Sequence, residues 1–452
     1  MSVLTAPEAD RVRSAIRALP FQPDPARHDI RSALPAALQP MLQNGFLEHS
    51  FKTALFPSLL YAAAADAEPW LDNLGATRTS TRKGLLPVVT TPTTGSDASL
   101  ATYPLEQWSV KMDQYSQAVA TDMLSNLVAL ASKYAADIQT LGLNAGQSIN
   151  ALARNKLYTA YKGGRTWVTT TNTTSTTIAV HDVEGFLYKN VNGVPTAVSA
   201  GNPLTVTVGG VANTVTGASV TSGAGNLTVG TTTAVTVGDA IVAANAPVSI
   251  RPTGNTAFNL TSGSIATASL FRSAVARLRK MNVPTVNGNY IAHIDPDTEA
   301  QLFADADFKQ AYQGRGDSAV FQNMSIGTFL GIDWVRNTEA PVITDGGTAA
   351  SGASGTLTVH RPIVLGAGAL IAAPLQGQGQ LLTETGVSTV PNIAMVNVAN
   401  GIDVVLIVRP PQDNLQQAIV STWSWTGDFG VPSDANTGDA ATFKRAILVE
   451  HA

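Results

Sequence analysis

The sequence predicts an α+β protein that carries an inserted all-β domain. Apolar residues recur every three or four positions over residues 117–141, the spacing of an amphipathic helix, and the C-terminal third mixes helical and strand-like segments. Between these parts, residues 166–250 contain 19 Thr, 16 Val and 10 Gly but only four charged residues, which favours short strands and tight turns. The chain has 452 residues, enough for two or three domains.

The chain is poor in charge, because 13% of its residues are charged where roughly 25% is usual. Two explanations stay open at this point: other copies of the chain cover much of its surface, or a Thr/Gly-rich β-protein is solvated by its hydroxyl groups. The net charge of −4 is too evenly spread to indicate a nucleic-acid-binding surface. No apolar run is long enough for a transmembrane helix, and the N-terminus lacks the apolar core of a signal peptide.

Residues 1–75 are predicted to form an extended arm. Prolines interrupt any long helix there, and apolar clusters that include Phe51 and Phe56 follow. Such a segment cannot form a core of its own. It must therefore lie on the rest of its chain or on a neighbour.

Residues 76–116 are predicted to form a long two-stranded excursion. One limb starts at Thr77 and contains Arg78, Arg82 and Lys83; the other runs over residues 105–113 and contains Trp108 and Lys111, and a turn-rich tip lies at 91–97. A hairpin this long and weakly apolar needs a partner surface. We expect the three cations of the first limb to pair with acids of a neighbouring subunit or to be solvated, rather than to contact nucleic acid.

Two helices and an α+β region are predicted around the β-rich segment. The first helix covers 117–141 with Gly142 as its C-cap, and the second covers about 148–161. Beyond the β-rich segment, a helix ends near Lys280, a strand covers 290–294, and a helix runs from Asp295 to about Tyr312. Further strands are expected at 331–336, 356–371, 402–409 and 442–449.

No pattern in the sequence indicates catalysis, a cofactor or a metal site. The chain has no cysteine, its six histidines lie far apart, and no nucleophile elbow, Walker A loop or dinucleotide fingerprint occurs. Asp295, Asp297 and Glu299 resemble the start of a calcium loop, but Ala306 stands where the bidentate glutamate belongs. We predict instead that Asp295 is a helix N-cap with Pro296 at the first helical position. Trp423 and Trp425 have strand spacing, which indicates core or interface packing.

The order of the segments resembles the major capsid proteins of tailed bacteriophages, which have the Hong Kong 97-type fold. An arm, a two-stranded excursion and a long helix precede a mixed α/β region, and the chain ends on a strand. Six local stretches look like that family: 271–279, 290–296, 331–335, 340–342, 363–369 and 441–449. The departure is the β-rich segment 166–250, which is identified as a surface-exposed insertion because some relatives carry an extra β-domain in this part of the fold.

The resemblance implies a division of the chain. Its parts are an N-terminal arm (1–75), an extended loop (76–116), the spine helix of a peripheral domain (117–164), a β-rich insertion domain (165–252), an axial domain (253–370) and a return to the peripheral domain (371–452).

The resemblance also implies a structural function and no enzymatic one. Subunits would form pentamers and hexamers that close into an icosahedral shell around double-stranded DNA, without sequence-specific binding and without a membrane. Scaffolding, portal and decoration proteins are the further partners implied, and the location is the virion, after assembly in the host cytoplasm. The implied contact residues between subunits are Phe51, Phe56, Arg78, Arg82, Lys83, Trp108 and Lys111. Some relatives crosslink an extended-loop lysine to a neighbour's asparagine; Lys83 is the candidate here, with no assignable partner.

Two alternatives remain at this point. Within the same fold, the chain could form an encapsulin-like bacterial nanocompartment, although the insertion and the long arm argue mildly against it. In a different class, it could be a β-rich surface or tail adhesin that binds through residues 166–250. That interpretation leaves the long helix and the axial-type region unexplained.

Overall fold

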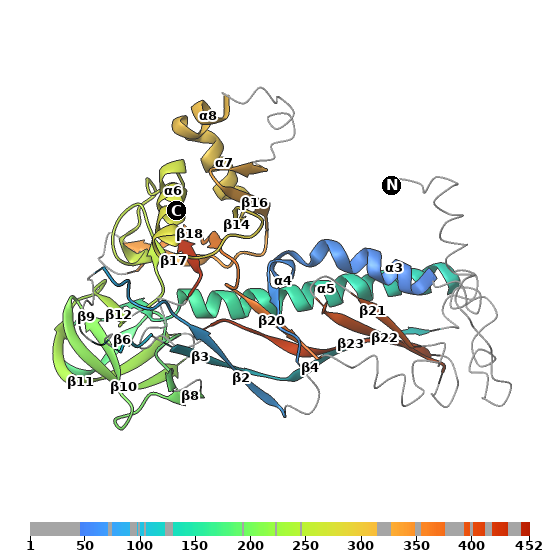
Figure 1. Cartoon of the computed structure of the whole chain (residues 1–452), viewed down its shortest axis with the longest axis horizontal. Helices are drawn as coiled ribbons and strands as arrows, with labels where there is room; N and C mark the ends of the chain where they lie inside the picture. The colour runs from blue at the N-terminus through green and yellow to red at the C-terminus, as the bar shows by residue number, and fades with distance from the viewer. Residues whose placement is uncertain are drawn as a thin grey trace.

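The computed structural model describes residues 46–70, 75–90, 97, 100–103, 105–122, 130–191, 194–221, 224–244, 246–313, 327–348, 354–375, 393–397, 401–411, 418–432 and 444–452. Within these ranges an elongated layer is built on a long helix, a second part rises from one half of that layer, and a β-barrel lies at the same end (Figure 1). Most of the predicted arm, residues 1–45, and most of the excursion's tip lie outside these ranges. None of the described helices is long and apolar enough to cross a membrane.

The elongated layer consists of helix α5 (Leu130–Lys162) on a mostly antiparallel sheet. The strands of this sheet are β1 (Asp66–Ala67), β20 (Ile371–Pro374), β23 (Ala418–Gly430), β22 (Asp403–Arg409), β21 (Ile393–Asn397) and β4 (Asp113–Asp122), which pairs with β23. On the opposite side of α5 lie α3 (Phe46–Leu55), a 3-10 turn (Phe56–Ser58) and α4 (Leu60–Ala63), as Figure 1 shows. Trp423 and Trp425 are buried in the core between helix and sheet, as their spacing predicts.

The predicted boundaries of the long helix are wrong. Residues 113–122 form strand β4, paired with β23 from Asp113 opposite Gly427 to Asp122 opposite Ala418. The helix begins at Leu130 and continues without a break through Gly142, so this glycine is not a C-cap and the two predicted helices are one. Residues 117–122 form a strand in spite of their helical spacing, because pairing with the edge of β23 provides hydrogen bonds for the backbone of β4. The predicted residues 123–129 lie outside the described part.

The excursion forms the predicted hairpin. Strand β2 (Thr77–Lys83) pairs antiparallel with β3 (Leu105–Lys111), and Thr77 lies opposite Lys111 while Lys83 lies opposite Leu105.

The Thr/Val-rich segment is all-β, as predicted, and its strands form a barrel. Its strands are β5 (Arg165–Trp167), β12 (Ala240–Ala243), β9 (Leu204–Val208), β10 (Val211–Thr221), β11 (Ala224–Val235) and β6 (Asn172–Val180), in this spatial order. A bridge between Val168 and Val180 joins the first strand to the last, so the sheet closes on itself. A small hairpin, β7 (Tyr188–Val191) and β8 (Val194–Ala197), extends from it. The barrel has a core of its own, built from alternate residues such as Leu204, Val206 and Val208.

The rising part is built on a mixed sheet. Its strands, in spatial order, are β13 (Ser249–Ile250), β24 (Ala446–Val449), β19 (Ile363–Leu365), β14 (Tyr290–Ile294), β16 (Ile332–Arg336) and β15 (Thr328–Phe329). Helices α6 (Ala268–Lys280), α7 (Pro296–Ala304) and α8 (Ala306–Gln313) belong to this part, with the short helix Ala257–Asn259 and the hairpin of β17 (Ile343–Thr348) and β18 (Ser354–Val359). The helix predicted to run to Tyr312 is two helices, because Asp305 has an extended backbone. The strand predicted over 356–371 is likewise divided, into β18, β19 and the start of β20.

The last strand differs from its predicted placement with the peripheral part. β24 pairs with β13 and β19 in the sheet of the rising part. Its alternate residues serve two cores, since Ala446 and Leu448 face the α5 core while Ile447 and Val449 face the α6 core. A strand buried on both faces must be apolar at every position, which explains the run Ala446–Val449.

Candidate functional site

The base of the β2–β3 hairpin is fixed to the elongated layer. Trp108 and Val110 of β3 are 3% exposed and pack with Trp70, Ile371 and Ala373. The base of the hairpin is therefore held in place by packing in a small apolar cluster.

Two arginines of β2 strengthen this attachment. The guanidinium of Arg82 donates a hydrogen bond to the carbonyl oxygen of Gly368 at 2.9 Å and lies 5.4 Å from the centre of the Trp108 ring. Burial, with Arg445 nearby, lowers the pKa of Arg82 to about 10. Arg78 donates to the backbone oxygens of Glu68 and Pro69 at 3.1 Å and pairs with the Glu68 carboxylate at 3.1 Å. Both arginines thus bind groups of their own chain, which the sequence does not predict.

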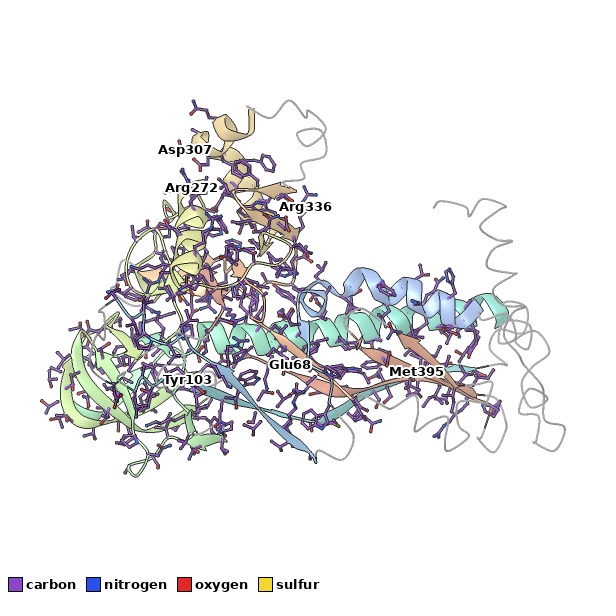
Figure 2. All side chains as sticks on the ribbon, in the orientation of Figure 1. Glu68, Tyr103, Arg272, Asp307, Arg336 and Met395 are labelled. Atoms are coloured by element: carbon purple, nitrogen blue, oxygen red, sulfur yellow. The ribbon has the colours of Figure 1, made fainter. Side chains whose placement is uncertain are left out.

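Beyond this base the excursion exposes a series of large apolar side chains. We call them the apolar excursion: Leu85 (75% exposed), Leu86 (57%), Val88 (87%), Val89 (77%), Leu100 (102%), Tyr103 (41%) and Leu105 (55%). Tyr103 is labelled in Figure 2, where it lies beside the barrel in this view. Several large apolar side chains exposed within one excursion indicate an interaction surface, because apolar surface in water is costly. The run Leu85–Val89 is visible in the sequence, but only the structure shows that nothing in the described part of the chain covers it.

The remaining predicted contact residues fall into two groups. Phe51 is fully buried between α3 and α5, and Trp108 is buried at the hairpin base, so both pack inside their own chain. Phe56 is 42% exposed, Lys83 is exposed at the end of β2, and Lys111 is exposed although it lies 3.7 Å from Asp113. These three keep side-chain surface that a neighbour could contact.

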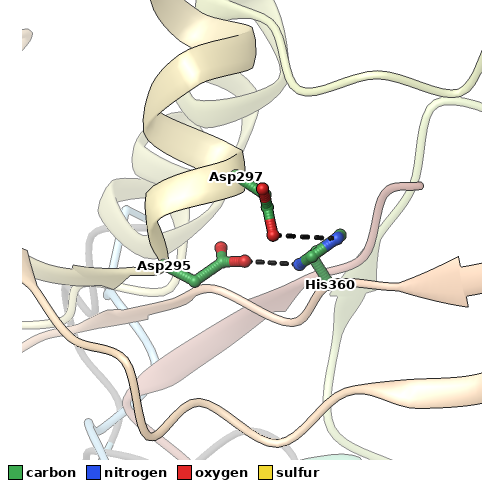
Figure 3. Close-up of side chains that lie close together, drawn as sticks. All are labelled: Asp295, Asp297 and His360. Atoms are coloured by element: carbon green, nitrogen blue, oxygen red, sulfur yellow. Dashed lines mark ion pairs between the residues drawn. The ribbon is translucent and has the colours of Figure 1, made fainter.

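A second cluster lies where α7 begins (Figure 3). Asp295 is the N-cap residue, as predicted, but its carboxylate does not cap the helix backbone. It faces Nδ1 of His360 and accepts a hydrogen bond from the hydroxyl of Thr298, while Nε2 of His360 lies 3.9 Å from a carboxylate oxygen of Asp297. Sequence reasoning missed His360, because it lies 63 to 65 positions from these aspartates and has no motif around it.

The types of residue in this second cluster would also suit a metal ion. The two ring nitrogens of His360 face different carboxylates: Nδ1 faces Asp295, and Nε2 lies 3.9 Å from Asp297. A protonated imidazole fits this arrangement, since it carries an N–H at each nitrogen.

Neither a protein-family model nor a curated protein sequence matches the chain. The chain is similar to phage capsid structures over most of its length. The capsid of Ralstonia phage GP4 aligns with a TM-score of 0.47 and 13% identity over 86% of this chain and 87% of that chain. The cyanophage Pam1 capsid aligns with a TM-score of 0.46 and 10% identity over 96% and 97% of the two chains. The capsid of Cyanophage P-SCSP1u aligns with a TM-score of 0.43 and 12% identity over 87% of this chain and 88% of that chain.

Proposed function

We propose that this chain is a major capsid protein of a tailed bacteriophage with the Hong Kong 97-type fold. It would assemble through pentamers and hexamers into an icosahedral shell that encloses double-stranded DNA. In this proposal the virion is its location, assembly takes place in the host cytoplasm, and scaffolding, portal and decoration proteins are its further partners. The solved structures named above, which are phage capsids, agree with the proposal.

The apolar excursion is the observation that carries this proposal. Its side chains are exposed although its base is fixed by Arg78, Arg82 and Trp108. A fixed base with an exposed apolar end supports docking on another subunit, because a flexible loop would lose more conformational entropy on binding. A contact between the hairpin of one subunit and a different surface of the next is heterologous, and repeated heterologous contacts close into rings.

The low charge content fits the same proposal. The elongated layer, the hairpin and the barrel form an extended shape and not a sphere, as Figure 1 shows. Large interfaces between copies are depleted in charge, so a subunit with neighbours on several sides needs fewer charged residues than a monomer.

Electron microscopy of the purified full-length chain tests the proposal. Negatively stained samples should contain closed shells tens of nanometres across, or particles of pentamer and hexamer size. A monodisperse monomer at high concentration, shown by size-exclusion chromatography with light scattering, would overturn the proposal. Shells that enclose a cargo enzyme would instead favour a bacterial nanocompartment.

A further inference from the structure

The ring of His360 lies between two carboxylates of the first turn of α7 (Figure 3). Its Nδ1 faces Asp295, whose side chain is 9% exposed, and its Nε2 faces Asp297, whose side chain is 74% exposed. Only the protonated ring can present an N–H to each of these carboxylates. The inner contact is shielded from water and the outer contact is open to it, so the inner one dominates.

A third ionisable group completes the surroundings of His360. The ring of His451 stacks on it with 5.4 Å between the ring centres, and Nε2 of His451 lies 2.7 Å from the hydroxyl of Thr298. Burial lowers the pKa of His451 to about 4, so this ring is neutral near pH 7 and does not repel a charged His360. Among the described residues, Asp295 and Asp297 at the start of α7 and His451 at the C-terminal end are thus the titratable groups that face His360.

The same cluster joins the C-terminal end of the chain to the rising part. His360 and His451 form an antiparallel bridge through backbone hydrogen bonds of 2.8 and 3.2 Å. The backbone N–H of Ala452 donates to Ser264, and the side chain of Gln301 in α7 donates to the carbonyl oxygen of Ala452 at 2.8 Å. The C-terminal residues therefore reach α7 partly through His360.

We propose that protonated His360 ties the C-terminal end of the chain to the start of α7, and that loss of its proton loosens this end. We call this contact the clamp: it joins the C-terminal end and the start of α7, which are far apart in the sequence, only while His360 is protonated. It does not depend on the function proposed above.

The hydrogen bond with Asp295 raises the pKa of His360, and burial only partly opposes it. A histidine whose folded-state pKa is raised stabilises the fold fully below its unfolded value, about 6.5, and this contribution is lost as the pH rises through the raised value. Burial raises the pKa of Asp295, but His360 and Thr298 outweigh it and lower that pKa overall. The clamp is therefore lost on the alkaline side through His360.

Hydrogen exchange measured by mass spectrometry on a peptide covering residues 444–452 tests the clamp in the full-length protein. Between pH 6.5 and pH 9, after correction for intrinsic exchange, the protection of this peptide should fall by about tenfold, as expected for one charge-assisted hydrogen bond. The variant His360→Gln should have low protection at both pH values. Equal pH dependence in the wild type and in His360→Gln would overturn the proposal, as would full protection of the wild type at pH 9.

Two further variants keep the test decisive if His360→Gln folds poorly. Asp297→Asn removes the exposed carboxylate only, so the protein should fold and should lose protection at a lower pH than the wild type. Asp307→Asn, an equally exposed aspartate on α8 that faces Arg272 at 3.8 Å, is the matched control and should keep the wild-type profile. Protection of Asp297→Asn that persists to a higher pH than in the control would contradict the role of His360.

Discussion

Gly142 of α5 lies directly against the backbone of Phe51 in α3: a Cβ atom on this glycine would stand 2.5 Å from the Phe51 carbonyl oxygen. One turn along the helix, a Cβ on Gly146 would stand 2.6 Å from the carbonyl oxygen of Leu55. The two glycines form a groove into which the backbone of α3 fits. Because they lack side chains, the two glycines allow α3 to approach α5 this closely, and the packing gained outweighs the usual cost of glycine inside a helix.

Replacing either glycine by alanine should therefore destabilise the protein. An exposed helical Gly→Ala change stabilises by about 0.5–1 kcal/mol, but here the added methyl group meets backbone that cannot move aside. We expect Gly142→Ala and Gly146→Ala each to lower the free energy of unfolding by about 1–3 kcal/mol. Urea denaturation measures this, and the exposed neighbour Gln147→Ala should change it by less than about 0.5 kcal/mol. Stabilisation by Gly142→Ala would show that α3 does not pack this closely.

The apolar excursion should be required for assembly but not for folding. Leu86→Asp and Val88→Asp place charges on side chains that are 57% and 87% exposed, so the isolated subunit should keep its circular dichroism spectrum and melting temperature. Electron microscopy should then show no shells, because a buried carboxylate without a partner opposes docking. Val211→Asp, at a 61% exposed valine of the barrel, is the control and should still assemble. Normal shells from Val88→Asp would remove this surface from the assembly contacts.

Arg82 should hold the base of the hairpin. Arg82→Gln removes the hydrogen bond to Gly368 and the cation above Trp108. Loss of this half-buried contact should lower the free energy of unfolding by about 1–2 kcal/mol and increase limited proteolysis within residues 84–103. Lys83→Gln on the same strand, where the side chain is exposed, should change neither value. Proteolysis at the wild-type rate in Arg82→Gln would mean that the Trp108 cluster alone fixes the hairpin.

His293 should make the fold sensitive to acid. It is fully buried against Tyr61, with 4.4 Å between the ring centres, and neither of its nitrogens has a hydrogen-bond partner among the described residues. Burial lowers the pKa of His293 to about 3. Its folded-state pKa is below the unfolded value of about 6.5, so its neutral form stabilises the fold fully above pH 6.5, and this contribution is lost as the pH falls toward about 3.

Phenylalanine at position 293 keeps a flat ring against Tyr61 and cannot be protonated. His293→Phe should raise the free energy of unfolding, and the gain should be about 2 kcal/mol larger at pH 5 than at pH 8. Urea denaturation of the unassembled protein at the two pH values measures the difference. An equal gain at both values would show that His293 is not the acid-sensitive group.

Features defined by neighbouring residues could be predicted, and features defined by distant contacts could not. The hairpin of β2 and β3 and the all-β character of residues 166–250 follow from alternation and turn residues. Strand β4 was predicted as helix because residues 117–122 contain apolar positions at helical spacing, and only the edge of β23 makes them a strand. The partners of Arg78 and Arg82 lie in segments that the sequence does not place beside them.

The sequence by itself determined an α+β protein with an inserted all-β domain, an arm and an excursion without cores of their own, and a surface with few charges. These properties follow from composition and spacing, which act locally. Only the tertiary structure decided that Gly142 packs against α3 and does not end a helix. It also decided that Phe51 and Trp108 are buried while Leu86 and Val88 are exposed. Finally, it placed His360 between Asp295 and Asp297. Each of these depends on which segments meet in space, and packing, burial and charge pairing act across that distance whatever the separation in sequence.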